Sequence, residues 1–152
     1  MIGQGLFFDE YKIGATYKTL GRTVSETDIV NFVNLGGFTE PLFMDMEYVA
    51  RESVLGGRAA PGALTFAFSE GLCMQTGLIH GTGMAWLGGE VKVTAPVLAG
   101  DTIYVEIEIV DKRETKKPDR GIVTYKHRVF NQRGDTVMEL KLQRMIKRKK
   151  PA

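Results

Sequence analysis

Residues 62–79, GALTFAFSEGLCMQTGLI, decide the fold. Apolar side chains recur on almost every side of the helix that this segment would form, and a helix that is apolar most of the way round is usually buried. Pro61 stands directly before it, a position at which a helix tolerates proline. We therefore expect one long buried helix over residues 62–79.

Four segments after this helix have the pattern of β-strands. Apolar and polar residues alternate in 102–110 and 137–147, with one apolar face in each segment, and 83–96 and 121–131 are of the same kind. Short turns between the segments favour antiparallel pairing. The expected fold class is α+β: an antiparallel sheet wrapped around one long apolar helix. The order of the elements fits the hot-dog arrangement, and periodicity alone leaves other α+β sheets open.

Two shorter helices are expected before the central one. Ser25 is a candidate N-cap with Asp28 three residues later, and Gly36-Gly37 would end that helix. A second short helix is expected over 46–53, with Asp45 as its cap. A short strand is expected over 17–24.

Length and composition bound the function. A chain of 152 residues fits a single domain, residues 1–152, and a net charge of +2 argues against nucleic acid as the main partner. The single cysteine, Cys73, favours a reducing compartment, and neither a signal peptide nor a membrane span is visible, so we expect a cytoplasmic protein without membrane contact. The basic residues of 144–150 are either a solvated chain end or an attraction for an anionic ligand such as a phosphate group.

Four segments carry a resemblance to a known family: RTVSETDIVNF (22–32), GRAAPG (57–62), APVLAGDT (95–102) and KRETKKPDRG (112–121). In this order they resemble the MaoC-like dehydratases, which include (R)-specific enoyl-CoA hydratases. The resemblance implies a hot-dog domain that binds an acyl-CoA thioester. Coenzyme A would enter only as part of the ligand, with no separate cofactor, and the chain would form a homodimer or a higher homo-oligomer.

The resemblance breaks at the catalytic motif. Family members place Asp and His in a motif like Gly-Asp-x-x-Pro-x-His-x-Asp, and residues 37–45 read GFTEPLFMD. Gly37, Pro41 and Asp45 align, but Phe38 takes the position of the Asp and Phe43 that of the His. Addition of water to an enoyl thioester requires an acid and a base, and a phenyl ring is neither.

The thioester-holding group of the family is implied to remain. It is a backbone N–H at the start of the central helix, which corresponds to Gly62, and unpaired N–H groups at a helix N-terminus favour negative charge on a bound oxygen. Phe38 and Phe43 would make the neighbouring wall apolar, which suits an acyl chain.

Other charged and nucleophilic residues are weaker candidates. Glu40 and Glu70 are the carboxylates that could replace the missing pair. The alternative for Glu40 is a turn residue that faces solvent or pairs with a cation, and for Glu70 a salt-bridged or interface carboxylate. Arg58 and Arg120 could bind the phosphates of coenzyme A or could lie in solvated loops. No metal site is expected, because His80 and His127 have no companion ligands at metal spacing and are interpreted as surface or loop residues; Cys73 is interpreted as a small core residue.

Several functions stay open on this basis. The chain could bind acyl-CoA without the usual Asp/His mechanism. It could be a hydratase or dehydratase that uses Glu40 or Glu70, a thioesterase that uses Glu70, or a structural domain.

Overall fold

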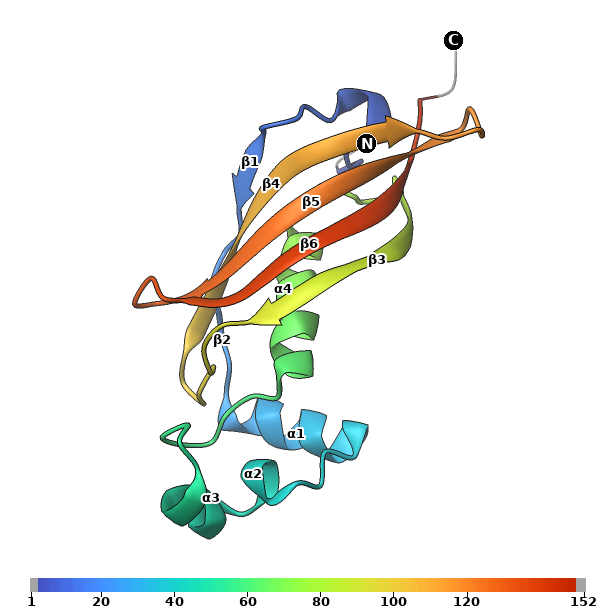
Figure 1. Cartoon of the computed structure of the whole chain (residues 1–152). Helices are drawn as coiled ribbons and strands as arrows, with labels where there is room; N and C mark the ends of the chain where they lie inside the picture. Colours follow the sequence, from blue (N-terminus) through green and yellow to red (C-terminus); the bar gives the residue numbers. More distant parts are fainter. Residues whose placement is uncertain (1–2, 150–152) are drawn as a thin grey trace.

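The computed structural model describes residues 3–149 and shows one antiparallel sheet with a helix packed against one face (Figure 1). The sheet has the order β1-β4-β5-β6-β3, and β2 also pairs with β4. The strands are β1 (Thr16–Lys18), β2 (Arg22–Thr23), β3 (Gly83–Val93), β4 (Thr102–Glu114), β5 (Arg120–Asn131) and β6 (Thr136–Lys147). The helices are η1 (Phe8–Glu10), α1 (Glu26–Gly36), α2 (Pro41–Met44), α3 (Met46–Glu52) and α4 (Gly62–Gln75). The predicted α+β class and the helix-and-sheet arrangement are confirmed.

Helix α4 is the predicted central helix, but it ends four residues earlier than residue 79. Thr76 ends it, because the Thr76 hydroxyl donates to the Cys73 carbonyl at 2.6 Å and Gly77 takes a left-handed conformation with φ +76°. Such a conformation favours glycine and commonly closes a helix.

Alternation in the strands places one face of the sheet on the core. In β4 the four isoleucine and valine residues at alternate positions are all buried: Ile103, Val105, Ile107 and Ile109. In β6 Met138, Leu140 and Leu142 are buried in the same way. The β4 pairing continues past a bulge near Val110, so this strand runs to Glu114 rather than to residue 110.

Helices α1, α2 and α3 lie beyond the N-terminal end of α4 (Figure 1). The Ser25 hydroxyl accepts a hydrogen bond from the Asp28 N–H at 3.0 Å and the Asp28 carboxylate accepts one from the Ser25 N–H at 2.8 Å, which is the predicted capping box. Asp45 caps α3 by accepting from the Tyr48 N–H at 2.9 Å, as expected. Helix α2, which begins at Pro41, was not predicted.

Two arginines of the basic chain end, Arg144 and Arg148, form ion pairs in the structure. Arg144 is buried, and Arg148 pairs with Asp9 at 2.7 Å and with Glu114 at 3.0 Å. Lys150 lies outside the described residues. Both interpretations of the basic chain end, a solvated end and an anion-binding cluster, are therefore wrong for Arg144 and Arg148, because both residues already have carboxylate partners. Over residues 3–149 no helix combines the length and the apolar character needed to cross a bilayer.

Strand β3 is one edge of the sheet, and within residues 3–149 it pairs only with β6. It approaches β6 closely at Gly89, where a Cβ atom would clash with the Lys141 carbonyl oxygen. The strand nevertheless exposes a row of large apolar side chains: Met84, Trp86, Leu87, Val91 and Val93. Polar backbone groups along an uncovered edge, combined with apolar side chains, are typical of a surface that pairs with another strand.

Candidate functional site

The N-terminus of α4 presents unpaired backbone donors. Pro61 is the N-cap and supplies no side-chain cap, while its carbonyl accepts from the Leu64 N–H at 2.9 Å and from the Thr65 N–H at 3.2 Å. Among residues 3–149, the N–H groups of Gly62 and Ala63 donate to no acceptor. With the helix dipole behind them, these two donors can stabilise negative charge on a bound oxygen.

Gly62 is also the point where α4 meets the sheet edge. A Cβ atom at Gly62 would lie 3.2 Å from Cγ2 of Val93, so the absence of a side chain lets the end of β3 approach the helix. Val93 is 57% exposed. The helix N-terminus therefore opens toward solvent beside an apolar strand end.

Phe38 and Phe43 lie together in an aromatic cluster formed by α1, α2 and the loop between them. The Phe38 ring centroid is 5.4 Å from that of Phe32 and 6.1 Å from that of Phe43. Two glycines allow this: Gly37 has φ +68°, and a Cβ at Gly36 would lie 2.7 Å from the Phe38 ring. The Phe38 ring therefore folds back over the C-terminus of α1 and presents no proton donor or acceptor.

Arg58 connects the segment before α4 with α1 and α2 through its side chain. Its Nη1 donates to the Phe43 carbonyl at 3.3 Å, and its Nε lies 2.8 Å from a Glu26 carboxylate oxygen, out of line for a hydrogen bond but close enough for an ion pair. Its side chain is only 17% exposed. Arg58 thus links α1, α2 and the segment before α4, and much of its charge is already compensated.

The structure separates Arg120 from the α4 N-terminus. Gly62 lies beside Val93, which pairs with Met138, and Met138 pairs with Val129. Arg120 is nine residues further along β5, or about 30 Å away. It donates to the neighbouring Asp119 at 2.7 and 2.8 Å. One chain therefore does not bring Arg120 and Gly62 into one site.

Glu40 stays exposed at the start of α2, where it is the N-cap residue without a side-chain cap. Glu70 is instead engaged: both of its carboxylate oxygens accept hydrogen bonds from Nη2 of Arg144, at 2.8 and 2.7 Å. Of the two candidate carboxylates, only Glu40 therefore has no partner within the described chain.

His127 is buried, and its interpretation as a surface residue is wrong. It lies on the inner face of the central strand β5 and is 1% exposed. Its Nδ1 is 3.8 Å from Glu70 Oε1 and 3.8 Å from Cys73 Sγ. Burial, with the nearby Arg144 charge, lowers the pKa of His127 to about 3, so its imidazole is neutral. His80, by contrast, is exposed as expected.

Glu70, Cys73 and His127 offer a carboxylate, a thiol and an imidazole within 4.8 Å of one another. Burial, with the Glu70 charge, raises the pKa of the Cys73 thiol to about 12, which keeps it protonated. A metal ligand must be a thiolate, and Arg144 already neutralises the carboxylate. These conditions oppose a cation here, and the absence of a metal site stays a prediction.

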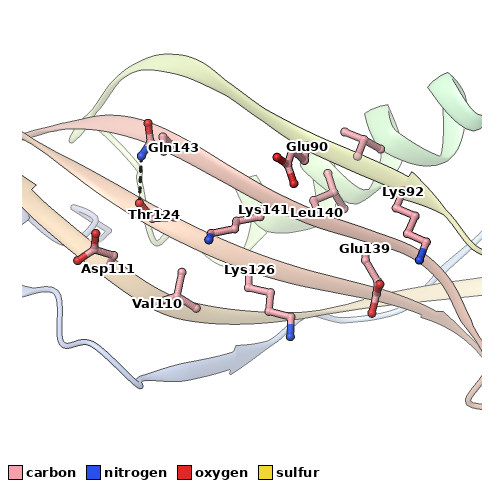
Figure 2. A pocket seen from close by; sticks show the side chains of 11 residues that line it. Glu90, Lys92, Val110, Asp111, Thr124, Lys126, Glu139, Leu140, Lys141 and Gln143 are labelled. Carbon is pink, nitrogen blue, oxygen red and sulfur yellow. Dashed lines mark hydrogen bonds between the residues drawn. The ribbon is translucent and has the colours of Figure 1, made fainter.

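A different groove, of about 730 Å³, crosses the outer face of the sheet (Figure 2). Its charges alternate in sign: Glu90 lies opposite Lys141, and Lys92 lies opposite Glu139. Such complementary cross-strand pairs stabilise a solvated sheet face. We assign this groove no role in the site.

Comparison with known proteins identifies the family. The family model described as MaoC like domain matches residues 9–131. This chain belongs to the MaoC-like domain family. Within the family, it is 32% identical to the uncharacterized protein YdeM of Bacillus subtilis over 92% of this chain and 98% of YdeM. It is 29% identical to the (R)-specific enoyl-CoA hydratase of Rhodospirillum rubrum over 79% of this chain and 78% of the hydratase.

Solved structures share the fold of this MaoC-like chain. The monoamine oxidase regulatory protein of Archaeoglobus fulgius superposes with a TM-score of 0.89 at 32% identity, covering 99% of each chain. Another relative, 27% identical over 70% of this chain and 65% of its own length, is named 3-hydroxybutyryl-CoA dehydratase and comes from Methylorubrum extorquens.

Sequence reasoning grouped Arg144 with the basic chain end and missed its pairing with Glu70, although a signal existed. The apolar positions Met138, Leu140 and Leu142 alternate along β6, and the next inward position is Arg144. Glu70 is a carboxylate on a buried helix, and a buried charge requires a partner of opposite sign. An arginine at an inward position of the sheet could therefore have been predicted as that partner.

Proposed function

We propose that this MaoC-like chain binds an acyl-CoA thioester and does not hydrate it by the usual Asp/His route. One observation carries the proposal: the Gly62 and Ala63 N–H groups are unpaired at the N-terminus of the 14-residue helix α4. A thioester carbonyl oxygen that accepts from these groups would be polarised by the helix dipole. Relatives named as enoyl-CoA hydratases support the choice of thioester.

The aromatic cluster supports binding over the usual chemistry. Phe38 and Phe43 stand at the positions that the family motif gives to its acid and base, and their rings pack on each other at 6.1 Å. General acid–base catalysis commonly contributes about 10²–10⁴-fold to a rate, and that contribution is lost without both groups. Apolar rings at the acid and base positions of the family motif favour an acyl chain over an attacking water.

We further infer that the chain forms a homodimer through β3. This edge strand exposes Trp86 at 46%, Val91 at 47% and Val93 at 57%. Pairing of two β3 strands would satisfy the free backbone groups and cover these side chains. Binding at the α4 N-terminus would then take place beside the subunit interface.

The test is calorimetric titration of the full chain with butyryl-CoA, with coenzyme A alone as the reference ligand. Gly62→Pro removes one N–H at the first helical position, which tolerates proline, whereas Gly62→Ala adds the same Cβ and keeps the N–H. We expect butyryl-CoA to bind more tightly than coenzyme A. Gly62→Pro should weaken binding about three- to tenfold relative to Gly62→Ala.

Two parallel assays decide between binding and turnover. Loss of the crotonyl-CoA enoyl absorbance would show hydration, and release of free thiol from acyl-CoA would show thioester hydrolysis. We expect neither at enzymatic rates. Hydration lost in Glu40→Gln, or hydrolysis lost in Glu70→Gln, would overturn the proposal in favour of the corresponding enzyme, and no binding at all would leave a structural domain.

A further inference from the structure

Residues 39–55, which contain α2 and α3, have few contacts with the rest of the chain. Of these residues only Val49 is buried, and it lies outside the main core cluster. Within residues 3–149 their charged side chains form no ion pair. One hydrogen bond within the described chain reaches them from beyond the adjoining Gly37: Nη1 of Arg58 donates to the Phe43 carbonyl at 3.3 Å. Segments with so few buried contacts open locally at a small fraction of the free energy of global unfolding.

The chain on both sides of this segment is fixed. Phe38 belongs to the end of α1, because its N–H donates to the Val33 carbonyl at 3.0 Å and its ring packs on that of Phe32. After the segment, Ala59 is buried and forms a β-bridge with Leu98. A loosely held segment between two fixed flanks can move as one body without unfolding of the rest.

Both connections to the flanks allow such a movement. On one side, Gly56 takes a left-handed conformation with φ +81°, and a Cβ atom at Gly57 would meet nothing closer than Cδ1 of Leu98 at 3.9 Å. On the other side, residues 39 and 40 are exposed and lie in no helix or strand. Hinges in proteins are typically a few positions of this kind at the ends of elements.

Arg58 is placed to hold the segment in its present position. Its guanidinium is fixed on α1 by Glu26, with Nε 2.8 Å from a carboxylate oxygen, and the same group donates to the Phe43 carbonyl on α2. The Phe43 ring packs edge-on against Phe38, and both rings pack against the core. Movement of the segment away from α1 would break these two contacts and uncover apolar surface.

We propose that residues 39–55 are a lid that opens about residues 39–40 and Gly56-Gly57, with Arg58 as the positioning residue that holds it closed. Opening carries Phe43 away from Phe38 and admits the apolar part of a ligand between the lid and the core. The identity of that ligand rests on the proposed acyl-thioester binding, whereas the opening itself does not. The lid therefore controls how fast an acyl chain enters and leaves.

The experiment measures the opening with a thiol placed in the lid of the full chain. Val49→Cys puts the thiol at a position that is 5% exposed, and Val33→Cys in α1 and Val129→Cys in β5 are controls at positions that are 3% and 0% exposed. All three variants keep Cys73, whose burial and pKa of about 12 make it a slow background in each. With DTNB under native conditions, Val49→Cys should react at least about tenfold faster than both controls, because lid opening requires less free energy than global unfolding. Equal rates for the three thiols would overturn the lid.

Second changes in the Val49→Cys chain test the roles of Arg58 and the hinge. Arg58→Met removes the hydrogen bond to Phe43 and should speed the reaction about three- to tenfold. Gly57→Ala restricts the open state without a close contact and should slow the reaction about two- to fivefold. No acceleration by Arg58→Met would overturn its positioning role, and no slowing by Gly57→Ala would overturn the hinge.

Ile109→Val is the control for a general loss of stability, because Ile109 is buried in the sheet and lies outside the lid. It destabilises the closed and open states equally relative to the unfolded chain. It should therefore speed the reaction of Val33→Cys and leave that of Val49→Cys unchanged. Acceleration of Val49→Cys by Ile109→Val as large as that by Arg58→Met would show that the segment opens only by global unfolding, and would overturn the lid.

Butyryl-CoA connects the lid to the ligand. At saturation it should slow the reaction of the Val49→Cys thiol about tenfold, because a ligand held under the closed lid opposes opening. If butyryl-CoA binds by calorimetry and leaves this rate unchanged, the role of the lid in ligand entry is overturned. If it does not bind while the Val49→Cys thiol still reacts faster than the controls, the proposed function is overturned and the opening of the lid stands.

Discussion

Arg144 and Glu70 form a closed ion pair between sheet and helix, with Nη2 of Arg144 donating to both carboxylate oxygens at 2.8 and 2.7 Å. The two residues are 74 positions apart, and their side chains are only 6% and 16% exposed. A pair in this environment joins β6 to α4 by charge as well as by packing.

Removal of one partner of this pair should be costly. Arg144→Met leaves the Glu70 carboxylate buried without compensation, and we expect the free energy of unfolding to fall by about 3 kcal/mol in urea titration. The double variant Arg144→Met with Glu70→Leu should recover most of the loss, because an apolar pair carries no desolvation penalty. Equal losses in the single and double variants would show that packing, not charge, dominates.

His127 should make the fold sensitive to acid. The unfolded imidazole has a pKa of about 6.5 and the folded one about 3, because burial excludes the proton. Between these values the unfolded chain binds a proton that the folded chain does not. Stability should therefore fall as the pH drops below about 6.5, by up to about 1.4 kcal/mol per pH unit. His127→Gln should remove this slope between pH 7 and pH 5 in urea titrations, and an unchanged slope would contradict the burial.

Gly89 should be required for the sheet edge. A methyl group there would clash with the Lys141 carbonyl oxygen and would lie 2.7 Å from Leu142 Cα, and these backbone atoms cannot rotate away. We expect Gly89→Ala to lower the free energy of unfolding by about 3 kcal/mol, through overpacking between β3 and β6. Glu90→Ala, at the next and exposed position, is the matched control and should change stability by less than about 0.5 kcal/mol.

Charge on β3 should dissociate the proposed dimer. Val91→Glu places a carboxylate on the exposed apolar row, and the same change on both copies would bring like charges together across the interface. Sedimentation should shift from dimer to monomer without loss of secondary structure. Val54→Glu alters a residue that is 97% exposed and lies outside β3, so it should leave the sedimentation unchanged.

Restoration of the family's acid and base should restore chemistry if the rest of the site is intact. Phe38→Asp with Phe43→His places a carboxylate and an imidazole where the family motif has them. We expect measurable hydration of crotonyl-CoA by the double variant and none by either single variant. The measurement is the loss of the enoyl absorbance. Folding is checked by circular dichroism, since both rings contact neighbouring aromatic residues.

Much of the fold followed from periodicity. The alternation in 102–110 predicted which residues of β4 face the core, and Ser25 and Asp45 predicted the starts of α1 and α3, because these signals are local. The end of α4 was less clear, since apolar residues continue to Ile79 while Thr76 and Gly77 end the helix.

The site was harder to predict because it depends on distant residues. The Gly62 position followed from the resemblance, but the contact with Val93 depends on how β3 packs against α4. Arg120 could not be placed from sequence, since its distance from Gly62 is set by strand register. His127 could have been placed, because it alternates with the buried Val123, Tyr125 and Val129 along β5.

The order of the elements has a consequence for synthesis on the ribosome. Helix α4 is complete at Gln75, but the strand that carries Arg144 is complete only at Lys147, 72 residues later. Translation proceeds at about 5–20 residues per second, so roughly 4–14 seconds pass between synthesis of α4 and synthesis of the complete sheet that covers it and pairs with Glu70. The nascent chain is therefore a natural client for chaperones that shield apolar segments during translation.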